Sequence, residues 1–167
     1  MPFPVHSLDS APEESRSSMI AMEREFGAIP VPIAKMATSP ELLNGFLEAT
    51  HAFDRTTLPP IAREVMIMTV AVRNGCHTCV GLHAAALRRL GAAELVDPLR
   101  HDQALQDQQL DAIRVFTHRL MDRTGAVEDS DLTAFLDAGY TEQNALEVVY
   151  GIGAYTMSTF ANRLIGA

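Results

Sequence analysis

The stretch that decides the fold is Arg63 to Gly91, REVMIMTVAVRNGCHTCVGLHAAALRRLG. Its first half is almost continuously apolar, and Gly75 separates it from a second run that starts at Cys76. Glycine commonly follows a helix C-terminus because it adopts a left-handed backbone conformation without strain. The pattern therefore predicts two helices, about 61–74 and 76–90, that meet at Gly75.

On both sides of this stretch, the Ser, Thr, Pro and Gly residues between apolar segments are typical of helix ends. The alternation of apolar and polar residues that marks a strand is nearly absent. Ser10 and Ser39 precede a proline and a glutamate in the manner of helix starts, and Thr141 precedes the last helix. We expect an all-α multi-helix bundle with the cysteine motif at the N-terminus of a central helix. The further helices are expected at about 10–26, 40–53, 106–123, 129–137 and 142–164. Pro30 and Pro32 indicate an interruption, and 95–105 receives no assignment.

Composition excludes several classes of partner. The chain has 167 residues with 47% apolar content, which suits one domain spanning 1–167. Its formal charge is -8 and Lys35 is its single lysine, so a basic face for nucleic acid or anionic membranes is not expected. Neither a secretory signal nor a membrane-spanning stretch is recognisable, which predicts a cytoplasmic protein. Thiols are kept reduced in the cytosol, so the two cysteines are not expected to form a structural disulfide.

The cysteines occur as Cys76-His77-Thr78-Cys79, followed by His83. At about 100° per residue of a helix, Cys79 lies about 300° and His83 about 340° from Cys76, so all three share one face. Both cysteines are expected at a helix N-terminus, where free backbone N–H groups and the dipole lower the pKa of a thiol. The spacing therefore predicts a thiolate and a reversible disulfide.

Glu64 is the acidic residue expected behind this face. No other Asp or Glu lies between Asp54 and Glu94, and the helix that carries Glu64 is apolar nearly all round. Burying an unpaired charge costs on the order of several kcal/mol, so a hydrogen bond to His83 on the adjoining helix is expected. His83 would then take a thiol proton while Glu64 orients the imidazole.

Glu64, eleven intervening residues, and then Cys76, Cys79 and His83 form the pattern E-x11-C-x2-C-x3-H. In this pattern the stretch resembles the core of the alkylhydroperoxidase D and carboxymuconolactone decarboxylase superfamily. The resemblance implies an all-helical fold that commonly assembles into trimers or hexamers, with Cys79 attacking the peroxide and Cys76 resolving the product. The decarboxylases of the superfamily lack the cysteine pair, which argues against lactone decarboxylation here.

The motif departs from the superfamily's peroxidase pattern at one position. A histidine directly precedes the second cysteine in that pattern, whereas this chain has Thr78 there. His77 lies one position earlier, and no role is carried over to it.

These residues predict a thiol-dependent alkyl hydroperoxide reductase in antioxidant defence, with no metal or organic cofactor. The peroxide oxidises Cys79 to a sulfenic acid, Cys76 condenses with it, and a dithiol or protein reductant reopens the disulfide. The resemblance suggests a reductant of the lipoyl type. Two alternatives stay open, namely a general disulfide reductase and a redox-sensing helical assembly protein without significant peroxidase turnover.

Other interpretations of the same residues also stay open. Cys76 and Cys79 are also compatible with a pair of small buried hydrophobes. With His83 and Glu64 they offer ligands for zinc, although structural zinc sites usually draw ligands from two separated knuckles.

The last predicted helix carries apolar residues on several faces, including Val148, Ile152, Tyr155 and Phe160. Small helices with surplus apolar surface commonly bury it between subunits. We therefore expect a homo-oligomer.

Overall fold

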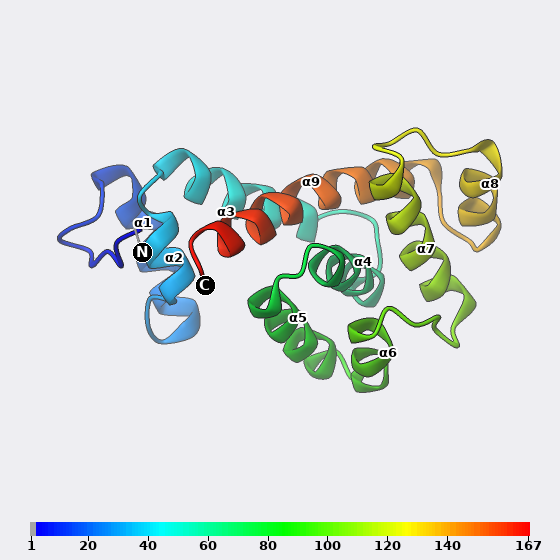
Figure 1. The fold of residues 1–167 in the computed structure, drawn as a ribbon, viewed down its shortest axis with the longest axis horizontal. Coiled ribbons are helices and arrows are strands. Elements are labelled where there is room, and N and C mark those ends of the chain that lie inside the picture. Colours follow the sequence, from blue (N-terminus) through cyan, green and yellow to red (C-terminus); the bar gives the residue numbers. More distant parts are fainter. Residues whose placement is uncertain (1–2) are drawn as a thin grey trace.

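The computed structural model describes residues 3–167, and all regular structure in that part of the chain is helical. The α-helices are α1 (Glu13–Phe26), α2 (Val31–Met36), α3 (Pro40–Asp54), α4 (Pro60–Arg73), α5 (His77–Arg89), α6 (Val96–Arg100), α7 (Gln108–Asp122), α8 (Asp129–Asp137) and α9 (Glu142–Leu164), and the 3-10 turn η1 (Ala93–Leu95) precedes α6. The expected all-α class is confirmed. α1 and α2 lie at one end of the elongated molecule, α7 and α8 lie at the other, and α9 runs between them (Figure 1).

α4 is the central helix. Every residue from Val65 to Ala71 is buried, and α5, α6, α7 and α9 all pack against it. A helix that is apolar on all sides needs partners on all sides. The continuous apolar run in the sequence therefore marks the helix around which the others assemble.

The corner between α4 and α5 is held by backbone hydrogen bonds. Gly75 has a φ of 64°, and its N–H donates to the carbonyl of Val72 at 3.0 Å, while the Cys76 N–H donates to the carbonyl of Ala71 at 3.0 Å. This pair of bonds is the Schellman arrangement that ends helices at glycine. The predicted cap at Gly75 is confirmed, and it delivers Cys76 directly to the start of α5.

α9 crosses α3 and α4 at a point where a glycine is needed. A Cβ atom at Gly151 would lie 2.6 Å from Cε2 of Phe53 and would also overlap Cε of Met66. Two positions further along, a Cβ at Gly153 would meet nothing within 4 Å. The absence of a side chain at Gly151 therefore lets α9 approach the two inner helices closely.

Two apolar clusters meet along α9. The larger contains α4 with parts of α5 to α8, and α9 contributes Val148, Ala154 and Tyr155 to it. The smaller joins α1, α2 and the start of α3, and Ala161 and Ile165 complete it. No helix in the described part of the chain combines the length and the apolar character that a membrane span requires.

The start of α1 differs from the expectation. The helix begins at Glu13 with Pro12 as its N-cap, and no side chain caps it. The hydroxyl of Ser10 accepts a hydrogen bond from the Ser7 N–H at 3.0 Å instead. The turn that precedes the helix therefore takes the serine that the capping-box spacing assigned to α1.

The interruption expected at Pro30 and Pro32 is present, because α1 ends at Phe26 and a separate helix, α2, follows with Pro30 as its N-cap. Pro32 itself lies in the first turn of α2, where its missing N–H would have had no helical partner. The segment left unassigned at 95–105 begins with the end of η1 and then forms the short helix α6.

Candidate active site

Cys76 and Cys79 are joined by a disulfide at the start of α5. Their Cα atoms are 5.4 Å apart, which is within the ordinary range for this bond. Cys76 is the N-cap of α5, and its Sγ accepts a hydrogen bond from the Cys79 backbone N–H at 3.4 Å. The structure thus places both sulfurs beside the first turn of the helix, where the dipole favours negative charge.

Both sulfur-bearing residues are buried, with 2% of Cys76 and 5% of Cys79 exposed. Ala71 and Val80 pack against them, whereas the two residues between the cysteines are exposed. The disulfide therefore faces the interior, and the side chains of the helix opposite determine its surroundings.

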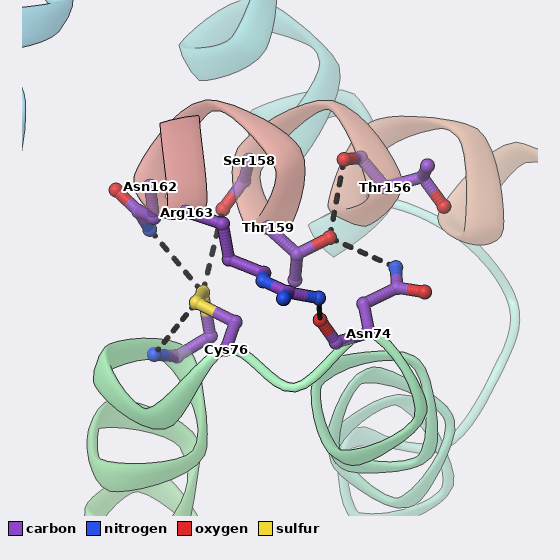
Figure 2. The surroundings of a disulfide bond; sticks show 8 residues. Asn74, Cys76, Thr156, Ser158, Thr159, Asn162 and Arg163 are labelled. Carbon is purple, nitrogen blue, oxygen red and sulfur yellow. Dashed lines mark hydrogen bonds between the residues drawn. A yellow bond between two sulfur atoms is a disulfide. The ribbon is translucent and has the colours of Figure 1, made fainter. Parts of the chain in front are cut away.

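That opposite helix is α9, which brings the polar side chains of Ser158 and Asn162 to the disulfide (Figure 2). Asn162 donates from Nδ2 to Cys79 Sγ at 3.2 Å, and Ser158 Oγ lies 3.9 Å from the same sulfur. Each of these α9 residues is 6% exposed, and they stand one helical turn apart. Neither residue was predicted from the sequence, because only the crossing of α9 over α4 and α5 brings them to the sulfur.

α9 also fixes the α4–α5 corner itself. Asn74 donates from Nδ2 to Thr159 Oγ1 at 2.9 Å, and Arg163 donates from Nη1 to the carbonyl oxygen of Asn74 at 2.6 Å (Figure 2). A Cβ at Gly75 would lie 3.4 Å from that guanidinium nitrogen. The corner that carries the cysteines is thus attached to α9 by side-chain and main-chain hydrogen bonds.

Glu64 and His83 form a hydrogen-bonded pair between α4 and α5. His83 Nδ1 lies 2.8 Å from Glu64 Oε2, and the two side chains are 13% and 17% exposed. A carboxylate can only accept, so Nδ1 carries a proton and Nε2 is the nitrogen that can exchange one with a neighbouring group. The structure therefore brings together the two residues that the sequence analysis paired.

Tyr155 of α9 packs edge-on against this imidazole. The two ring centroids are 5.3 Å apart at an interplanar angle of 83°. Burial, together with the negative charges of Asp54 and Glu64, raises the pKa of the Tyr155 hydroxyl well above its ordinary value. Tyr155 is therefore uncharged, and its ring restricts the rotation of the His83 side chain.

The hydrogen bonds at the sulfurs and at the imidazole are separate. Within residues 3–167, no hydrogen bond joins His83 to Cys76 or Cys79. His83 follows Cys79 by four positions, a spacing that puts Cβ atoms about 5–6 Å apart on a helix. The base is thus a near neighbour of the sulfur on the same helix.

The motif and the fold both have counterparts among known proteins. Residues 37–97, which contain Glu64, both cysteines and His83, match the model of the carboxymuconolactone decarboxylase family. An uncharacterized peroxidase-related protein from Ralstonia eutropha JMP134, described as an alkylhydroperoxidase AhpD core, superposes with a TM-score of 0.86 at 21% identity, covering 98% of this chain and 89% of that one. The chain has the alkylhydroperoxidase D fold. The resemblance predicted from the motif is therefore confirmed.

Two further solved structures share the alkylhydroperoxidase D fold of this chain. A peroxidase-related protein from Silicibacter sp. TM1040 has a TM-score of 0.82 at 19% identity, covering 99% of this chain and 88% of its own. The debrominase Bmp8, solved as a cysteine-to-alanine variant with 2,3,4-tribromopyrrole, has a TM-score of 0.78 at 17% identity, with coverages of 99% and 89%. No curated protein is detectably similar to the chain in sequence. The alkylhydroperoxidase D fold thus carries more than one chemistry.

The alternative of a zinc site requires several ligands to converge on one point. In the described residues, no group of three or more His, Cys, Asp or Glu side chains lies close enough to hold a metal ion. Glu64 and His83 bind each other, and the two sulfurs are bonded together. The four motif residues are therefore arranged as two pairs within the alkylhydroperoxidase D fold.

Proposed function

We propose that the chain is a thiol-dependent hydroperoxide reductase in which Cys79 attacks the peroxide and Cys76 resolves the product. The observation that carries the proposal is the Glu64–His83 pair, 2.8 Å apart, beside the cysteines at the start of α5. A disulfide with a purely structural role needs no oriented base next to it. A thiol that must lose a proton before it reacts does need one.

The reaction begins when the Nε2 atom of His83 takes the proton of the Cys79 thiol. The thiolate attacks the peroxide, an S–O bond forms as the O–O bond breaks, and the departing alkoxide takes the proton from the imidazolium. Cys79 is then a sulfenic acid. The thiol of Cys76 attacks its sulfur, the hydroxyl leaves as water with the Cys76 proton, and the disulfide seen in the structure is formed.

A dithiol must reduce this disulfide to complete the cycle, because two electrons pass to each peroxide. Exchange begins when an external thiolate attacks one of the two sulfurs. We propose a dithiol of the lipoyl type or a protein reductant, and a cytoplasmic setting in which such reductants are maintained. The cycle uses the chain's own side chains and needs no bound cofactor.

Peroxide consumption driven by dihydrolipoamide tests the proposal. Purified protein should consume hydrogen peroxide or an alkyl hydroperoxide with one dithiol oxidised for each peroxide, and Cys79→Ser should abolish it. Reduction of insulin disulfides is measured in parallel. Efficient insulin reduction without peroxide turnover would assign the chain as a general disulfide reductase, and inactivity in both assays would favour a redox-sensing role.

We also propose that the chain forms a homo-oligomer through the outer face of α9. The residues first expected there are partly wrong, because Val148 and Tyr155 are buried inside the protomer. The exposed apolar positions of α9 are instead Leu146, Val149, Tyr150, Phe160 and Leu164.

Four of these positions, all except Val149, follow the geometry of helix pairing when Gly153 and Met157 are placed between them. Leu146, Tyr150, Gly153, Met157, Phe160 and Leu164 are spaced alternately by four and three residues, which is the a/d pattern of a two-helix seam. The stripe is about 27 Å long at about 1.5 Å per residue. Leu146 and Leu164, at its two ends, are 72% and 70% exposed. A second copy offers the same stripe and is the self-complementary partner of a two-fold interface.

Sedimentation or light scattering tests this interface. The wild type should sediment as an oligomer at micromolar concentration, and Phe160→Glu should shift it toward the protomer without changing the helix content. Gln108→Glu, an exposed substitution at the start of α7, is the control for added charge. A monomeric wild type would contradict the proposal.

A further inference from the structure

Asn162 is a buried asparagine with only half of its amide in use. Nδ2 donates to Cys79 Sγ at 3.2 Å, whereas Oδ1 is buried and has no hydrogen-bond partner among residues 3–167. Buried polar atoms are nearly always paired, and an unpaired one requires an explanation. Here the unpaired atom is about two bonds from a nitrogen that touches the proposed reactive sulfur.

The bonded half of the amide is suited to a negatively charged sulfur. The sulfur of a disulfide is a weak acceptor, whereas a thiolate is a charged one, and hydrogen bonds to charged acceptors are shorter and stronger. A donor that contacts the charged form lowers the pKa of the group it contacts. Among the described residues, Asn162 and Ser158 contact Cys79 Sγ, and no side chain of α9 donates to Cys76 Sγ. α9 therefore distinguishes two cysteines that their spacing on α5 leaves nearly equivalent.

The unpaired half of the amide is suited to a proton donor bound beside that sulfur. A hydroperoxide carries such a donor on the oxygen that a thiolate attacks, and the sulfenic acid keeps the same O–H. We propose that Asn162 is a catalytic residue, whose Nδ2 group holds Cys79 as the thiolate and whose Oδ1 atom accepts the O–H of the attacked hydroperoxide. This inference rests on the proposed peroxidase function and assigns a residue outside the motif to it.

The step balances without a further reactant. The thiolate electron pair forms the S–O bond and the O–O bond breaks. The hydroxyl hydrogen stays on the transferred oxygen and remains bonded to Oδ1 of Asn162. The alkoxide takes its proton from the imidazolium of His83. The amide thus orients both atoms of the new S–O bond while the base serves the leaving group.

The donor half is tested by the pH dependence of thiol reactivity in a Cys76→Ser background, where Cys79 is the only thiol. Methyl methanethiosulfonate is the probe, since it carries neither an O–H nor an N–H group. Asn162→Ala should move the midpoint of the rate profile upward by about one pH unit, and the isosteric Asn162→Asp should move it further because a carboxylate repels the thiolate. A simple packing role would not put the alanine and aspartate variants in that order.

Asn144→Ala is the matched control. Asn144 is also a buried asparagine of α9, but it lies about 27 Å along the helix from Asn162 and is bonded to Thr57 and Glu147. Its profile should coincide with that of the Cys76→Ser parent. If the profiles of Asn162→Ala and Asn162→Asp also coincide with the parent, the donor role is overturned.

The acceptor half is tested at a pH above the midpoints of all variants, where Cys79 is fully ionised in each. The rate with hydrogen peroxide is divided by the rate with methyl methanethiosulfonate. Asn162→Ala should lower this ratio by about tenfold, the effect of one lost hydrogen bond of about 1.4 kcal/mol. An unchanged ratio would overturn the acceptor role. A parent that reacts with the thiosulfonate but not with peroxide would refute the peroxidase function, while the pH profiles would still decide the donor role.

Discussion

The two halves of α9 are built on different principles. Its N-terminal half is held by close packing, since Gly151 lies against Phe53 and Met66 with no room for a Cβ atom. Its C-terminal half makes polar contacts instead, because Ser158 and Asn162 face the sulfur of Cys79. One helix thus carries a packing contact and a chemical contact about two turns apart. Substitutions in the two halves should therefore separate stability from reactivity.

The largest effect on the reaction with peroxide is expected from substitution of the cysteines. Cys79→Ser should abolish reaction with peroxide, because a serine hydroxyl is far less acidic than a thiol and does not form a sulfenic acid. Cys76→Ser should be oxidised once and then stall, since no resolving thiol remains. Trapping with a sulfenic-acid reagent and intact mass analysis should show one adduct on Cys76→Ser and none on Cys79→Ser.

Both serine variants should unfold at nearly the same temperature as the reduced wild type, measured as the control. The reverse adduct pattern would mean that the attacking and resolving cysteines are exchanged. It would also contradict a chemical role for the C-terminal half of α9, because Ser158 and Asn162 would then contact the resolving sulfur and not the attacking one.

A smaller but still large effect is expected at Glu64. Glu64→Gln keeps the shape of the side chain but removes the charge that supports an imidazolium at His83. Peroxidase turnover should fall by about 10²–10⁴-fold, the usual result of losing acid–base assistance. Glu147→Gln is the matched control, because Glu147 is also hydrogen-bonded but lies at the N-terminal end of α9. Equal losses in the two variants would show that turnover reports general stability and not a relay.

The packing half of α9 is probed by two glycines. Gly151→Ala should lower the free energy of unfolding by up to about 2 kcal/mol, because overpacking costs about 1–3 kcal/mol and the helix propensity of alanine returns about 1 kcal/mol. Gly153→Ala meets no atom within 4 Å and should be neutral or stabilising. Urea unfolding measures both, and the folded fraction of each variant should react with peroxide at the wild-type rate. Loss of reactivity in folded Gly151→Ala would show that the halves are coupled.

The smallest effect concerns acid stability at the start of α9. Partial burial would raise the pKa of Glu147, but hydrogen bonds from Thr57, Asn144 and Gln143 outweigh it and lower the pKa below its ordinary value. The ionised group therefore stabilises the folded protein above its unfolded-state pKa, and this contribution is lost as the pH falls through the folded-state value.

Glu147→Gln should accordingly be less stable than the wild type near neutral pH. The difference should be under about 1 kcal/mol, because solvent screens a partly exposed carboxylate. The two unfolding midpoints should converge in acid. A difference that grows as the pH falls would contradict the assigned sign.

Sequence patterns predicted most of the fold because most of its helices are specified locally. The glycine after α4, the serine before α3 and the threonine before α9 each act on their own helix end, and the structure shows all three caps. The failure at Ser10 has a local cause too, because the hydroxyl of this serine is bonded within the turn that precedes α1. The prolines between α1 and α2 separate the two helices, as expected, and Pro32 also suits the first turn of α2.

Only the part of the candidate site that lies in one continuous stretch of sequence could be predicted. Glu64 and His83 stand on two adjoining helices, so the length of the corner between them and the need to pair a buried charge were enough. Asn162 comes from a helix some eighty positions further along the chain, and its contact with Cys79 depends on how α9 crosses α4 and α5. No periodicity within α9 specifies that crossing.

Because α9 follows the cysteines in the sequence, it is synthesised after them, and this order affects their reactivity in the growing chain. The α4–α5 corner closes through hydrogen bonds between near neighbours and can form as soon as Cys79 has been made. Ser158 and Asn162 follow Cys79 by 79 and 83 positions, so they reach the sulfur only after α9 has been made. Because domains are made from the N-terminus onward, a nascent or truncated chain holds its cysteines without the groups that select between them. Full thiol reactivity would then report that α9 has been made and has packed against the cysteines.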